Sequence, residues 1–175
     1  VPGFIDIHTH SDSTLFDYPL AESRIFQGVT TEIGANCGIS PAPVNPDRMK
    51  LLKDYAGHLD YDWQRFSEYL DRLEKAGTST NFGTLAGHGT IRLAVMGFDD
   101  RKPSEKEMEE MIQLLRQSME DGAYGMSSGL IYPPGCFSDV DEMAALVKEL
   151  KPYGGYYATH MRDEATQTLP TRAEV

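Results

Sequence analysis

The chain has 175 residues, 40% of them hydrophobic, which is enough to bury a substantial core. Its formal net charge of −11, from 27 acidic and 16 basic side chains, argues against nucleic acid and anionic membrane surfaces as partners. No apolar run reaches the roughly 18 residues of a membrane span, and two cysteines, Cys37 and Cys136, are too few for a disulfide framework. We therefore expect a cytoplasmic protein.

The first predicted element is a short buried strand, Phe4–Ile7, which is followed directly by His8 and His10. Side chains two residues apart on a strand project to the same face, so the two imidazoles should converge on one point. Such convergence is a common way to present two nitrogen ligands to a metal. The alternative is a pair of exposed loop histidines. Asp6 shares the same face and could orient a ligand.

Short apolar runs then alternate with amphipathic helices, which is typical of repeated βα units and a parallel sheet. The later predicted strands are Val29–Ile33, Asn81–Leu85, Tyr124–Ser127 and Gly155–His160. The predicted helices are Leu20–Gln27, Trp63–Ala76 with Asp62 as its cap, one from the Ser104 capping box to Gly122, and one opened by Ser138 or Asp139. Gly34–Pro46, Ala86–Thr90 and the tail Asp163–Val175 are interpreted as loops.

Five such units in order predict an α/β chain with a (β/α)8 TIM-barrel architecture. A complete barrel normally needs about 250 residues, so we expect a partial barrel with about five of eight βα units. The active site of such a barrel lies where the strands end, and chemically competent residues gather there. Cys37 follows the second strand, His88 the third and His160 ends the fifth. Their residue types alone leave Cys37 and His160 open as ligands or as buried core side chains, while His58 is interpreted as a surface residue.

Five motifs then point to a family: GFIDIHTHSD, GVTTEIGANCGISPAP, AGHGTIR, SSGLIYPPG and YATHMRDE. Together, in this order from Pro2 to about Glu164, they resemble the N-acyl-D-amino-acid deacylases (D-aminoacylases) of the amidohydrolase superfamily. The resemblance implies a zinc site of one or two ions with His8, His10, Cys37 and His160 as ligands. It also implies hydrolysis of the amide bond of a small N-acyl-D-amino acid to a carboxylate and a D-amino acid.

The resemblance also separates this chain from related enzymes. Many two-metal amidohydrolases, such as dihydroorotases, bridge their metals with a carboxylated lysine on strand four, and Tyr124–Ser127 contains no lysine. Cys37 matches the cysteine that takes this position in D-aminoacylases. Tyr132 resembles a catalytic, substrate-facing tyrosine that polarises the scissile carbonyl, although it could simply pack in its turn. His88 and Arg92 are candidates for substrate binding, or equally for bracing loops.

The resemblance implies that residues 1–175 are the amino-terminal part of the catalytic barrel. Family members have a further histidine ligand on strand six, an aspartate base after strand eight and a flanking β-sandwich, for which we find no counterpart in the sequence. Two alternatives stay open: a related cyclic-amide hydrolase or deaminase, or a catalytically silent fragment that binds metal. The sequence does not predict the oligomeric state.

Overall fold

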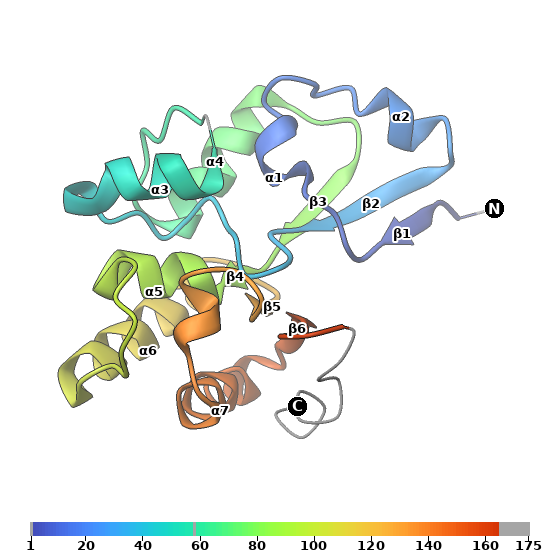
Figure 1. The fold of residues 1–175 in the computed structure, drawn as a ribbon. Coiled ribbons are helices and arrows are strands. Elements are labelled where there is room, and N and C mark those ends of the chain that lie inside the picture. Colours follow the sequence, from blue (N-terminus) through green and yellow to red (C-terminus); the bar gives the residue numbers. More distant parts are fainter. Residues whose placement is uncertain (1, 58, 165–175) are drawn as a thin grey trace.

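A computed structural model describes residues 2–57 and 59–164, and it contains two three-stranded parallel sheets in this part of the chain (Figure 1). The strands are β1 (Phe4–Asp6), β2 (Val29–Gly34), β3 (Asn81–Thr84), β4 (Ala86–Gly87), β5 (Gly125–Gly129) and β6 (Tyr156–His160). Their order is β1-β2-β3 in one sheet and β4-β5-β6 in the other.

The two sheets follow one another with a single residue, Leu85, between β3 and β4. Its amide donates to the carbonyl of Gly34 at 3.3 Å, and the amide of Tyr124 donates to the carbonyl of Thr84 at 2.9 Å. β3 and β4 therefore act as one interrupted barrel strand. The described residues thus form five parallel barrel strands in chain order, and the sheet is not closed. This confirms the predicted partial (β/α)8 architecture.

The helices lie between the strands in sequence, as βα units require. They are α1 (Ser11–Thr14), α2 (Glu22–Ile25), α3 (Met49–Ala56), α4 (Phe66–Ala76), α5 (His88–Met96), α6 (Glu105–Glu120) and α7 (Val140–Lys148), with short 3-10 turns at η1 (Pro46–Arg48), η2 (Gly135–Phe137) and η3 (Lys151–Tyr153). Figure 1 shows α5, α6 and α7 grouped beside β4-β5-β6. No helix in the described residues is both long and apolar enough to cross a membrane.

Local signals placed the starts of α6 and α7 correctly. The Ser104 hydroxyl accepts from the amide of Glu107, whose carboxylate accepts from the amide of Ser104, so the predicted capping box starts α6. Asp139 caps α7 by accepting from the amide of Glu142 at 2.9 Å. The predicted cap Asp62 is wrong, because α4 begins only at Phe66, after an N-cap at Arg65.

Helices α1, α3 and α5 were not predicted, and for α5 its surroundings explain why. Its first residues include a glycine and β-branched side chains, which have low helix propensity. Nearly all of its residues are buried, so the polar face that normally reveals a helix in a sequence is absent. The predicted loop Ala86–Thr90 is therefore β4 followed by the first turn of α5.

The first strand is exposed, contrary to the prediction. Phe4, Ile5 and Ile7 retain 68%, 65% and 66% of their accessible surface. The sequence pattern predicted burial because every strand of a closed barrel has two neighbours and a covering helix layer. Among the described residues, β1 pairs only with β2, so one of its edges has no strand neighbour, and its apolar side chains remain exposed.

Candidate metal centre

Three candidate ligands come together at the carboxyl ends of β1 and β2. His8 and His10 follow β1, and Cys37 lies in the loop after β2. One ligand atom from each residue can be chosen so that all three lie within 4.8 Å of one another. The two imidazole rings stand edge to face, 5.7 Å apart. Both histidines are exposed, whereas Cys37 is buried.

The backbone around Cys37 is tightly held. Cys37 has a left-handed backbone with φ of 57°, and Ala35 has φ of 56°. The amide of Ala35 donates to the carboxylate of Asp12 at 3.0 Å, and the amide of Gly38 donates to the Ser127 hydroxyl at 3.0 Å. A side chain at Gly38 would lie only 2.6 Å from the amide nitrogen of the residue at the end of β5. The loop is therefore locked against β5, which fixes the direction of the thiol.

His160, the last residue of β6, approaches the same sulfur atom. The Cys37 Sγ lies 3.4 Å from His8 Nε2 and 3.7 Å from His160 Nδ1. His160 Nε2 lies 3.4 Å from a carboxylate oxygen of the exposed Glu164. Cys37 therefore lies between a histidine of the first strand and a histidine of the last strand described.

These distances fit a zinc ion. A tetrahedral zinc lies about 2.0–2.1 Å from nitrogen and about 2.3 Å from sulfur, which places nitrogen and sulfur ligands about 3.5 Å apart. The two Cys37 distances bracket this value. Imidazole and thiolate are also the donor types that zinc prefers. The residues present thus fit zinc both in chemistry and in spacing.

Without a bound cation, the surroundings of the Cys37 thiol disfavour the thiolate form that binds zinc. Burial raises the pKa of the Cys37 thiol, and the negative charge of Glu164 raises it further. A divalent cation would favour the thiolate, because a coordinating thiol loses its proton.

Asp6 and Tyr132 both lie next to this group. The Asp6 carboxylate accepts from the amide of His8 at 3.1 Å and lies 3.5 Å from a guanidinium nitrogen of Arg24. It thus contacts the backbone of a candidate ligand. The Tyr132 hydroxyl lies 3.4 Å from His160 Nδ1, with the two rings 5.1 Å apart. Tyr132 remains 39% exposed, so part of this residue is accessible to solvent.

His88 and Arg92 lie elsewhere, in a buried ionic network. His88 Nε2 lies 2.8 Å from one oxygen of Glu142, and Arg92 pairs with the other oxygen. Arg92 also donates to the carbonyls of Asp99 and Arg101, at 3.3 and 2.7 Å. Both side chains are fully buried. Their predicted contact with substrate stays a prediction, and their placement fits the loop-bracing alternative.

Glu142 is the residue of this network that the sequence interpretation missed. It is 3% exposed although it is charged. A signal was available, because Glu142, Leu146 and Leu150 are spaced by four residues and the two leucines are buried. An acid in line with the apolar stripe of a helix needs a buried partner, and His88 and Arg92 supply it.

The same network predicts that the free energy of unfolding depends on pH. Burial alone would raise the pKa of Glu142, but His88 and Arg92 outweigh it and hold that pKa below its usual value. Its stabilising effect is therefore fully present above the unfolded-state pKa of about 4.3 and is lost as pH falls through the lower folded value. We expect Glu142→Gln to lower the free energy of unfolding by about 3–5 kcal/mol at pH 7, with the difference shrinking in acid.

Urea unfolding, followed by circular dichroism at a series of pH values from about 3 to about 7, measures this difference. The range is chosen because it includes the ordinary pKa of a glutamate side chain. Glu110→Gln is the control, since Glu110 pairs with Lys106 on the exposed face of α6. A Glu142→Gln loss that stayed constant down to the lowest pH would contradict the assignment.

Parallel strands in barrel order with histidine and cysteine donors at their carboxyl ends are typical of metal-dependent hydrolases. The chain belongs to the amidohydrolase family, whose model matches residues 1–171. Among curated proteins it is similar to a D-aminoacylase of Alcaligenes xylosoxydans xylosoxydans, with 41% identity over 99% of this chain and 36% of that protein.

Solved structures give the same result. The chain is similar to a D-aminoacylase structure described for its binuclear metal centre, with a TM-score of 0.87, 38% identity, and coverage of 99% of this chain and 37% of that one. It is also similar to the N-acyl-D-glutamate deacylase of Bordetella bronchiseptica in complex with zinc and a phosphonate inhibitor, with a TM-score of 0.86, 30% identity, and coverage of 99% and 36%. The chain thus spans just over a third of the length of these relatives.

Proposed function

We propose that these residues belong to a zinc-dependent hydrolase that cleaves the amide bond of N-acyl-D-amino acids, yielding a carboxylate and a D-amino acid. The observation that supports this most strongly is the position of Cys37 between His8 and His160, at distances suited to zinc. The names of the relatives support the substrate class, including its D configuration.

We further propose that residues 1–175 form the amino-terminal part of the catalytic barrel. The open sheet and the share of each relative that the chain covers support this arrangement. A further histidine ligand and the aspartate base, which the resemblance implies, would then belong to the remaining strands. By the full-length protein we mean the polypeptide that contains these residues together with those strands. A cytoplasmic location is proposed from the two free cysteines.

In this proposal His8, His10, Cys37 and His160 hold the metal. Zinc in such a site supplies Lewis-acid chemistry, polarising a carbonyl and lowering the pKa of water from 15.7 to about 7. Tyr132 donates its hydroxyl proton in a hydrogen bond to the carbonyl oxygen of the scissile amide, where negative charge develops. Asp6 holds the backbone amide of His8 and so keeps the first ligand pair in place.

A cyclic-amide hydrolase is the competing enzyme class, and strand β5 argues against it. β5 consists of Gly-Met-Ser-Ser-Gly and has no lysine that could be carboxylated to bridge two metals. Cys37 occupies the space between the candidate ligands instead. The proposal is therefore restricted to linear amides.

We expect the full-length protein to hydrolyse N-acetyl-D-amino acids far faster than the L enantiomers, and to leave dihydroorotate and hydantoin intact. The measurement is the release of the free amino acid from each enantiomer of a panel of side chains, with ring opening followed separately by absorbance. Comparable kcat/KM values for cyclic and linear amides would support the competing class.

A further inference from the structure

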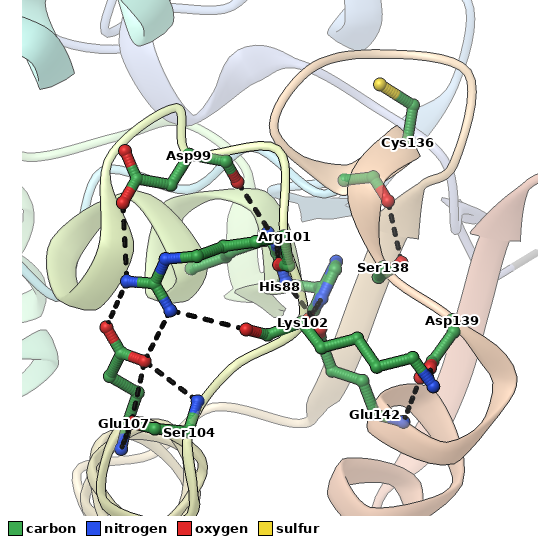
Figure 2. Close-up of polar contacts among 12 residues, drawn as sticks. His88, Asp99, Arg101, Lys102, Ser104, Glu107, Cys136, Ser138, Asp139 and Glu142 are labelled. Atoms are coloured by element: carbon green, nitrogen blue, oxygen red, sulfur yellow. Dashed lines mark hydrogen bonds and ion pairs between the residues drawn. The ribbon is translucent and has the colours of Figure 1, made fainter.

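The buried pair of His88 and Glu142 lies between the metal-ligand strands and the loop of Tyr132. His88 is the first residue of α5, directly after β4, and Glu142 lies in the first turn of α7. Figure 2 shows His88 and Glu142 in the same close-up as the segment with Cys136 and Ser138, and His88 Nε2 lies 2.8 Å from the Glu142 carboxylate. Because both residues are buried, their contact joins the end of β4 to α7, the helix that follows the next strand, β5.

The orientation of the His88 ring follows from its partners. Arg92 donates to Glu142, and the pKa of this carboxyl lies below its usual value, so the carboxylate is an acceptor and His88 Nε2, which faces it at 2.8 Å, acts as the donor. The other ring nitrogen, Nδ1, is buried and has no hydrogen-bond partner in the described part of the chain. It faces Gly135, where an added Cβ would lie 3.7 Å from Nδ1. The imidazole therefore lies directly beneath the backbone of the loop.

That loop, residues 130–138, is also tied to the metal-ligand side. The amide of Leu130 donates to the carbonyl of His160 at 3.1 Å. Arg162 donates to the carbonyls of Cys136 and Ser138, at 2.7 and 3.1 Å. At the tip, the Tyr132 hydroxyl approaches His160 Nδ1. The loop is thus supported by His88 from one side and by the end of β6 from the other.

We propose that His88, fixed by Glu142, is a positioning residue that supports loop 130–138 and thereby sets Tyr132 against the candidate ligand His160. The inference rests on the proposed metal site, because Tyr132 and His160 are its targets. His88 itself contacts neither substrate nor metal in this role. Loss of the imidazole would leave space beneath Gly135, and Tyr132 would lose its fixed distance from His160.

The test uses the full-length protein with variants His88→Leu, His88→Gln and Tyr132→Phe. The glutamine amide nitrogen can replace Nε2 as the donor to Glu142, whereas leucine cannot. The control is Leu73→Ala, which removes a buried side chain from α4, a helix that carries neither His88 nor Glu142. It should lower stability without disturbing the contact between His88 and Glu142.

We expect His88→Leu to lower the affinity for Co²⁺ by about 10–100-fold, the range typical of residues that orient metal ligands. It should also lower kcat for an N-acetyl-D-amino acid by about tenfold while changing KM little, and His88→Gln should recover most of both losses. In combination with Tyr132→Phe, His88→Leu should add no further loss of kcat, because both act through one hydroxyl. Leu73→Ala should lower only the melting temperature.

Additive effects of His88→Leu and Tyr132→Phe, or unchanged Co²⁺ affinity with a lower melting temperature alone, would overturn the inference. If His88→Leu does not fold, His88→Asn replaces it, since its shorter amide cannot reach Glu142. If the wild type binds Co²⁺ but does not hydrolyse N-acyl-D-amino acids, the proposed function fails while Co²⁺ affinity still decides the role of His88.

Discussion

Replacing Cys37 with serine should lower zinc affinity by more than about 100-fold, beyond the 10–100-fold cost of losing a residue that merely orients a ligand. The thiolate is the softest donor in the group and lies next to both His8 and His160, so its loss affects two nitrogen neighbours at once. Competition with a chromophoric chelator measures the affinity. Co²⁺ substitution adds a second measurement, since a bound thiolate produces a charge-transfer absorption.

Cys136→Ser is the matched control, because Cys136 is the only other cysteine of the chain and is also free. It should bind zinc like the wild type and keep the charge-transfer band. Equal zinc affinities in the two serine variants would remove Cys37 from the site. They would leave His8 and His10 as an exposed histidine pair, which is the alternative that the sequence left open.

The 175-residue chain by itself should associate in solution and should not hydrolyse amides. β1 and β6 are the outer strands of the described sheets, so each has an edge that can pair with another chain. The apolar side chains of β1 are exposed, and Phe26 nearby is 88% exposed. The ligand and base proposed for the remaining strands would also be missing.

Size-exclusion chromatography with light scattering measures the association. Ile5→Lys should reduce it, because a lysine on an edge strand opposes pairing, whereas Val140→Lys, at an exposed position of α7, should not. A deacylase assay on the same samples completes the test. A compact monomer with deacylase activity would contradict the proposal that further strands complete the site.

The alternation of strands and helices and the starts of α6 and α7 could be predicted because they follow from patterns in the local sequence. Ser104 and Asp139 cap their helices through contacts three residues away, and such contacts are visible in the sequence. Helix α5 could not be predicted in the same way, because its burial on all sides depends on the neighbours that surround it.

The candidate metal centre also has features that the local sequence predicts and features that depend on distant residues. His8 and His10 are two residues apart in sequence, so their pairing could be inferred from strand geometry, whereas Cys37 and His160 needed the family resemblance. The partners of His88 and Arg92 could not be derived, because Glu142 is 54 and 50 residues away from them. The exposure of β1 depends on which strands pair with it, and no pattern within β1 could reveal it.

The left-handed backbone at Cys37 has a consequence for engineering. A non-glycine residue in this conformation costs on the order of 1–2 kcal/mol, a cost that glycine would avoid. A search for thermostable variants that measured only thermal stability would therefore favour Cys37→Gly, and the candidate thiol ligand would be lost. Any library built on this scaffold needs a metal-retention screen alongside the heat challenge, since at this position the two selections favour opposite residues.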